Sequence, residues 1–179
     1  MGVHFRRPVV STSQTNLDDV IRCAITVQAH DVDVNSVSWN RCEQHLMASG
    51  ADDGSFRIWD LRTFGAKKIE PVAHWKWHSA PVTCVEWHPT DASVLCASGE
   101  DDQISIWDLA VEQDTEAAGS SGGGAMDGTG EREVPPQLLF VHQGQKNVKE
   151  AHWHKQLPGV VISTAESGFN LFKTISVTH

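Results

Sequence analysis

The sequence predicts an all-β fold in which small antiparallel sheets repeat along the chain, and three observations support this. The stretch SVSWNRCEQHLMASGADDGSFRIWDLR from Ser36 returns from Cys84 as CVEWHPTDASVLCASGEDDQISIWDLA, and a shift of 48 positions aligns the two without a gap. A repeat of this length is typical of stacked repeat architectures. Apolar residues alternate with polar ones inside both stretches, which is the period of a β-strand. Turn-forming Asp and Gly residues separate the alternating runs.

The strands follow from this alternation in chain order. Residues 1–22 are polar and aperiodic, so we assign no structure to them. Residues 23–177 form the folded part, in three units at 29–73, 77–141 and 142–177. Strands are expected near 24–27, 34–39, 45–50, 56–60, 67–73, 82–87, 94–98, 104–108, 137–141, 147–153, 160–163 and 169–172, and 174–177 is left as an outer strand.

The second unit contains an insertion at residues 112–136, EQDTEAAGSSGGGAMDGTGEREVPP. Its Gly, Ser and acidic residues are typical of disordered segments, and its length exceeds that of an ordinary connection. We therefore expect an acidic loop that projects from the sheet and contains no strand.

The overall charge bears on the kind of partner. The formal net charge is −9 and the isoelectric point is near 5.5, which disfavours direct nucleic-acid binding because phosphates are bound by Lys and Arg. The charge suits a basic protein partner, or it serves solubility alone. The chain has no apolar run of membrane-spanning length and no signal-peptide pattern. The four cysteines lie at irregular spacings without Cys-x-x-Cys, which favours a reducing, intracellular compartment over a disulfide framework or a zinc site.

Motifs of catalysis and of cofactor binding are missing from the sequence. There is no phosphate-binding glycine loop and no Gly-x-Ser-x-Gly. The pairs His74 and His78, and His152 and His154, have no Cys or carboxylate at ligand spacing, so no metal is expected. We expect neither an enzyme nor a small-molecule substrate nor a cofactor. Four tryptophans of the repeat are expected in the core: Trp39, Trp59, Trp87 and Trp107. Trp75 and Trp77 are free to lie at a surface.

The two aligned stretches resemble the WD-repeat family, whose members fold as β-propellers, over about residues 29–173. The resemblance implies a buried hydrogen-bonded chain in each blade, formed by a His, a hydroxyl residue, a turn Asp and a Trp. The first unit has all four: His30, Ser49, Asp53 and Trp59. These residues are then structural, not catalytic, because buried polar groups are costly when unpaired.

The later units depart from this pattern. The second unit has His78, Asp101 and Trp107, but Ala97 replaces the hydroxyl, so its network must be shorter or use Ser98. The third unit keeps the hydroxyl as Ser163, but it has Ser167 at the Asp position and Phe172 at the Trp position. We therefore expect its apolar packing to be kept and its polar network to be lost.

Longer phrases are similar to the C-terminal part of a glutamate-rich branch of the family, notably AHDVDVNSVSW, PQLLFVHQGQ and SGFNLFKTISV. That resemblance implies a nuclear or nucleolar ribosome-biogenesis factor, with the cytoplasm as a further compartment. It also implies a chaperone for a basic ribosomal protein of the large subunit (L-three) and binding of histones. The alternatives are a histone-binding chromatin adaptor and a substrate-receptor adaptor of a ubiquitin ligase.

Two expectations concern the surface. Turn carboxylates gather at one face of the sheets and form a candidate docking face for basic proteins, although turns also favour Asp for backbone reasons; the residues are Asp31, Asp33, Asp52, Glu100 and Asp102. About three four-stranded blades form only a partial propeller, because a closed ring needs four to eight. The chain alone is therefore expected to be unstable, aggregated or oligomeric.

Overall fold

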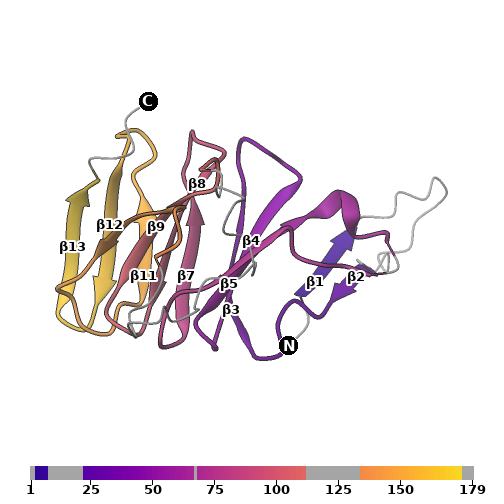
Figure 1. The fold of residues 1–179 in the computed structure, drawn as a ribbon, viewed down its shortest axis with the longest axis horizontal. Helices are drawn as coiled ribbons and strands as arrows, with labels where there is room; N and C mark the ends of the chain where they lie inside the picture. Colours follow the sequence, from indigo (N-terminus) through magenta and orange to yellow (C-terminus); the bar gives the residue numbers. More distant parts are fainter. Residues whose placement is uncertain (1–2, 8–21, 67, 112–133, 175–179) are drawn as a thin grey trace, which may run out of the picture.

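Four antiparallel sheets make up the fold in the computed structural model, which describes residues 3–7, 22–66, 68–111 and 134–174 (Figure 1). Three of them stand side by side as blades. The first blade contains β3 (Val34–Trp39), β4 (Leu46–Ala51), β5 (Ser55–Asp60) and β6 (Ala73–Lys76). The second contains β7 (Val82–Trp87), β8 (Val94–Gly99), β9 (Ile104–Asp108) and β10 (Leu138–His142). The third contains β11 (Glu150–Trp153), β12 (Val160–Ala165) and β13 (Gly168–Lys173).

A fourth, two-stranded sheet pairs β1 (Val3–Arg7) with β2 (Arg22–Val27). The described residues contain one helical turn, the 3₁₀ helix η1 (Leu61–Thr63). The prediction of an all-β, partial propeller of about three antiparallel blades is confirmed, with the third blade showing three described strands instead of four. No helix in the described part of the chain is long and apolar enough to span a membrane.

The core lies between neighbouring blades because the middle strands of the first two blades bury both of their faces. All six residues of β8 are buried, and so are five of the six residues of β4. One apolar cluster joins the first blade to the second, and another joins the second to the third. This two-sided burial explains why the middle strands consist of small and apolar residues with little charge.

Hydrogen bonds along the inner strands fix the blades in register. The Ser36 and Ser38 hydroxyls accept from the backbone N–H groups of Val85 and Trp87. Residue numbers rise together in the two strands, so β3 and β7 run in the same direction. A further pair joins β7 to β11 in the same way, through Glu86 and the Trp153 backbone N–H. The turns that precede the inner strands therefore lie along one edge of the molecule.

The outer strand of the first blade lies later in the chain than expected. The sequence suggested a strand at 67–73, but β6 spans Ala73–Lys76. Pro71 has no N–H to donate to a sheet ladder, and pairing with β5 begins only with the Val72 N–H to Ile58 O bond of 2.8 Å. This shift turns Trp75 onto the core.

Two expectations about tryptophans are therefore wrong. Trp75 stacks on Phe56 at 5.3 Å between ring centroids, and Trp77 meets Trp107 edge-on at 6.1 Å, so both pack against the core. Trp39 was expected in the core, but half of its surface is exposed. The burial of a side chain at a given repeat position thus depends on whether a neighbouring blade packs against it, as well as on the apolar alternation within its own blade.

The N-terminal region differs from the sequence analysis, which assigned no structure to residues 1–22. Val3–Arg7 form β1, which pairs along the whole of β2. The predicted acidic loop spans residues 112–136, of which 112–133 lie outside the described part of the chain. Residues 175–177 of the last expected strand lie outside it as well.

Candidate functional site

A buried hydrogen-bond network centres on Ser49 in the first blade. The His30 Nε2 and Ser49 Oγ atoms lie 2.8 Å apart, and the Trp59 indole N–H donates to the same oxygen at 2.8 Å. Asp53 does not contact His30 directly. Its carboxylate accepts from the Ser55 hydroxyl at 2.6 Å, and that hydroxyl lies 3.3 Å from His30 Nδ1. Ser55, which the sequence analysis did not single out, thus connects the turn to the network.

The electrostatics of this network keep the imidazole neutral. Burial, aided by the positive charge of Arg57, lowers the pKa of His30 to about 4. Burial alone would raise the pKa of Asp53, but hydrogen bonds from the Ser55 hydroxyl and backbone N–H lower it overall. A neutral histidine and a carboxylate separated by a hydroxyl hold the turn in place.

The second blade keeps a complete network although Ala97 lacks a hydroxyl. The Ser105 oxygen lies 2.9 Å from His78 Nε2 and accepts from the Trp107 indole at 2.8 Å. On its other side, His78 Nδ1 lies 2.8 Å from Asp101 Oδ1. The expectation of a shorter network is therefore wrong, and the alternative through Ser98 is wrong as well, because Ser98 bonds to Thr83 on the neighbouring strand instead.

Sheet register explains why Ser105 can replace the missing hydroxyl. Ser105 lies directly opposite Ala97 in the β8–β9 ladder, and Arg57 lies opposite Ser49 in the β4–β5 ladder. Directly opposite residues place their side chains on the same face of a sheet. Moving the hydroxyl to the partner strand therefore leaves its oxygen in the same buried place. The sequence contains this signal, since Ser105 follows Arg57 by the repeat length of 48.

The third blade retains a polar link that the sequence analysis missed. The Ser163 hydroxyl donates to Gln145 Oε1, and both side chains are buried. Gln145 thus takes the part that His30 takes on Ser49. Phe172 pairs with Val161 as Trp59 pairs with Met47, but it has no N–H, so the network ends at the hydroxyl.

These networks are structural. The central groups His30, Ser49 and Trp59 are at most 1% exposed, so a substrate cannot reach them. Among the described residues, no three His, Cys, Asp or Glu side chains gather in a way that could hold a metal ion. The surface therefore has to supply any binding site.

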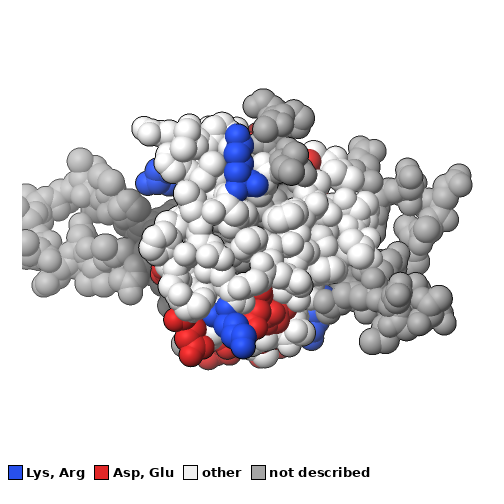
Figure 2. Space-filling view, turned by 90° about the vertical axis from the view of Figure 1, so that its left-hand side faces the viewer, with Lys and Arg blue, Asp and Glu red and all other residues white. Residues whose placement is uncertain are grey.

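The five turn carboxylates lie along the edge where the inner strands begin, and we call this edge the acidic edge: Asp31, Asp33, Asp52, Glu100 and Asp102. Antiparallel pairing places the starts of β3 and β5 and the end of β4 together. Adjacent turns are bonded, as in the Asp52 N–H to Asp33 O contact of 3.0 Å. Seen from the side of β13, acidic atoms gather at one edge of the molecule, with Lys or Arg atoms among them (Figure 2).

Three of these carboxylates have partners within the chain. Asp52 accepts from the Asn35 amide at 2.7 Å, Glu100 pairs with Lys149 at 3.2 Å, and Asp102 accepts from the backbone N–H of Asn147 at 2.5 Å. Asp102 also has a φ of +66°, a conformation that Asp tolerates better than most residues. These contacts orient turns and join the second blade to the third.

Asp31 and Asp33 are different. Both are exposed, and their side chains make no hydrogen bond or ion pair with another described residue. Of the acidic edge, these two carboxylates are the ones whose charge is fully available to a partner.

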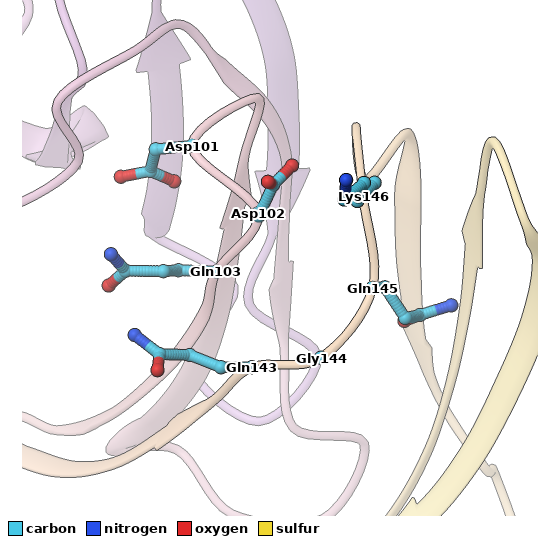
Figure 3. Close-up of a pocket in the computed structure, with 7 residues that line it drawn as sticks. All are labelled: Asp101, Asp102, Gln103, Gln143, Gly144, Gln145 and Lys146. Atoms are coloured by element: carbon cyan, nitrogen blue, oxygen red, sulfur yellow. The ribbon is translucent and has the colours of Figure 1, made fainter.

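A polar groove of about 290 Å³ lies where the acidic edge passes from the second blade to the third. Asp102 and Gln103 stand on one side of it and Lys146 on the other, while the Gln145 side chain points away from the groove (Figure 3). Lys146 and Lys149 make this end of the edge less acidic than the end at the first blade, a feature that the sequence analysis did not consider.

The fold and networks define a class of protein: repeated antiparallel blades of three or four described strands, each fixed by a buried hydrogen bond between a His or Gln and a hydroxyl. The sequence profile described as "WD domain, G-beta repeat" matches residues 21–60 and 69–108. The chain belongs to the WD-repeat family.

Several curated proteins are similar to the chain. The ribosome assembly protein rrb1 of Schizosaccharomyces pombe is 49% identical over 83% of this chain and 40% of its own length. The protein HEAT STRESS TOLERANT DWD 1 of Arabidopsis thaliana is 44% identical over 87% of this chain and 42% of its own length. The glutamate-rich WD repeat-containing protein 1 of Dictyostelium discoideum is 49% identical over 37% of this chain and 13% of its own length. The chain thus spans about two fifths of the first two relatives.

Proposed function

We propose that this chain is a non-enzymatic scaffold in ribosome assembly. The observation that carries the proposal is its 49% identity, over 83% of the chain, to a protein named for ribosome assembly. Burial of every network histidine supports a binding role over a catalytic one. A scaffold of this kind works in the nucleolus, so a fluorescent fusion should concentrate there.

The acidic edge is the proposed binding surface, and the proposed partner is the basic large-subunit ribosomal protein L-three. Asp31 and Asp33 offer unpaired carboxylates beside the inner strand β3, and the net charge of −9 favours approach of a basic protein. Opposite charges of this kind raise association rates and fix orientation more than they raise affinity.

A matched pair of double variants tests the surface. The change Asp31→Lys with Asp33→Lys removes no side-chain contact with another described residue. The control, Glu43→Lys with Glu70→Lys, alters exposed carboxylates of other loops. Both variants change the net charge from −9 to −5, since each substitution adds two charges.

Capture of purified L-three should weaken by about tenfold in the first variant at low salt, because exposed charges contribute a fraction of a kcal/mol each. The control should bind nearly as well as the parent chain. If both variants lose capture of L-three equally, the binding depends on the overall negative charge and not on the acidic edge. Core histones as a second probe separate the chromatin alternative: capture of histones without capture of L-three would favour the adaptor function.

A further inference from the structure

Side chains that do not titrate hold the first blade against the second. The Asn40 amide donates to the Ala92 carbonyl at 2.8 Å, and Trp75 of the outer strand β6 lies 5.5 Å from Trp107 between ring centroids. Further hydrogen bonds across this contact come from the amide of Asn35 and involve the hydroxyls of Ser36 and Ser38. None of these side chains gains or loses a proton between pH 5 and pH 8.

Histidines take two of these positions in the contact between the second blade and the third. His88 follows Asn40 by the repeat length of 48. His142 holds in β10 the ladder position that Trp75 holds in β6, because the residues opposite them are themselves 48 positions apart. Histidine is the side chain whose ordinary pKa lies between pH 5 and pH 8. The second contact therefore contains groups that titrate where the first contact has none.

His88 fixes the turn between β7 and β8 and packs on the third blade. Its Nδ1 atom accepts from the backbone N–H groups of Asp91 at 3.1 Å and Thr90 at 3.4 Å, so Nε2 carries the proton of the neutral ring. The ring is 3% exposed and meets Trp153 of β11 edge-on, with 4.7 Å between ring centroids. A second proton has to bind Nδ1, where it displaces both N–H groups. Protonation of His88 therefore breaks the turn beside the contact.

His142 lies flat on Phe172 of β13. The ring centroids are 3.9 Å apart and the ring planes differ by 11°. Its Nε2 atom is buried and has no hydrogen-bond partner among the described residues, so a charge on this ring is costly. Burial lowers the pKa of His142 and of His88, and for His88 the nearby carboxylate of Asp91 opposes this without reversing it. Both rings are thus held neutral while the third blade stays in contact.

Other charged groups at this contact have smaller or later effects. Protonated His152 pairs more strongly with Glu86, whose carboxylate lies 2.9 Å away, but both side chains are partly exposed and such pairs are weak. Glu86 and Asp102 also accept from backbone N–H groups of the third blade, and carboxylates lose this ability only at lower pH. The elements around the two histidines carry further charged or titratable residues, all exposed: Arg41, Glu43, Lys146, Glu150, His154, Lys155 and Lys173.

We propose that the contact between the second and third blades is a pH-sensitive hinge, which opens when mild acid protonates His88 and His142. The third blade then separates from the second as a unit of its own, whatever the state of the first blade. Opening also divides the acidic edge, because the ion pair of Glu100 with Lys149 and the polar groove both span this contact.

Amide hydrogen exchange of the full chain at pH 7 and pH 5, corrected for the intrinsic exchange rates, measures the opening. A histidine with a pKa of about 6.5 in the open state favours opening by up to about 25-fold between these two pH values. Protection of residues 150–173 should therefore fall by more than tenfold. Equal protection of the third blade at pH 7 and pH 5 would overturn the proposal.

Variants assign the effect to the two histidines. His88→Asn copies the anchor of the first contact, and His142→Phe keeps a ring on Phe172 without a titrating group. The double variant should keep the third blade protected at pH 5, and each single variant should recover part of the loss. His74→Asn, at an exposed position of β6 in the first blade, is the matched control and should behave as the parent chain.

A crossed comparison separates the hinge from general acid sensitivity. His30→Gln, which alters the network of the first blade, should improve protection of the first blade at pH 5 and leave the loss in the third blade unchanged. If the double variant and both single variants lose third-blade protection as the parent does, the two histidines are not the hinge. If His30→Gln restores the third blade, the blades open together and the separate hinge is refuted.

Discussion

Replacing Ser105 by Ala tests the reasoning about the second blade most directly. The hydroxyl accepts from the Trp107 indole at 2.8 Å, lies 2.9 Å from His78 Nε2, and donates to the Ala97 carbonyl at 3.1 Å. All four residues are essentially inaccessible to water. The substitution therefore leaves two ring nitrogens buried without a partner.

The expected loss of stability follows from these two groups. A buried polar group without a partner costs about 1–3 kcal/mol, so the two nitrogens together should lower the free energy of unfolding of Ser105→Ala by about 2–6 kcal/mol. Ser98→Ala is the matched control in the same blade. Its hydroxyl bonds to Thr83, which is only half-buried, so the loss should be about 1 kcal/mol or less. Urea unfolding, followed by tryptophan fluorescence, measures both.

Adding Ala97→Ser to Ser105→Ala supplies the decisive outcome. Residue 97 stands where Ser49 stands in the first blade, so the new hydroxyl should reach the same two nitrogens. Most of the lost stability should return. We argue that the blade is stabilised by a hydroxyl oxygen at this position, whichever of the two strands supplies it. A double variant no more stable than Ser105→Ala would refute this.

Three further predictions follow from single sites. Because the pKa of His30 is about 4 in the folded chain, against about 6.5 when unfolded, its contribution to stability is complete above pH 6.5 and is lost as the pH falls towards 4. His30→Gln should reduce the loss of stability between pH 7 and pH 5, measured by urea midpoints, by about 2 kcal/mol. Gly54→Ala should lower the stability of the folded chain by about 2–4 kcal/mol in a thermal melt. Gly54 has a φ of +78°, and a Cβ there would lie 2.1 Å from the backbone oxygen of His78. Gly65→Ala, which has open space around it, is the control and should be nearly neutral. The exposed Cys42 should react with a thiol reagent in the folded chain, whereas Cys96, fully buried and with its pKa raised well above its usual value by burial, should react only on unfolding; equal rates would contradict this.

The sequence predicted most of the strands because alternation reports directly on which face is buried. It misplaced β6 because Pro71 interrupts the apolar run and ladder pairing starts after it. It missed Ser105 because aligning the two repeats compares Ser49 only with Ala97. The alignment does not show that Ser105 lies opposite Ala97 on the neighbouring strand. It placed Trp39 in the core because a repeat pattern cannot show whether a neighbouring blade covers that position.

The third blade shows what a blade requires. The family profile matches the chain only as far as residue 108, yet β11, β12 and β13 pack on the second blade through the same positions as the earlier contact. Gln145 replaces the His and still bonds the Ser163 hydroxyl, while Phe172 keeps an apolar aromatic ring at the Trp position without the indole N–H. A profile scores residue types at positions, whereas packing needs an apolar face and a buried oxygen with a partner. A segment can therefore form a blade with residues that the profile does not score, as residues 150–173 do here.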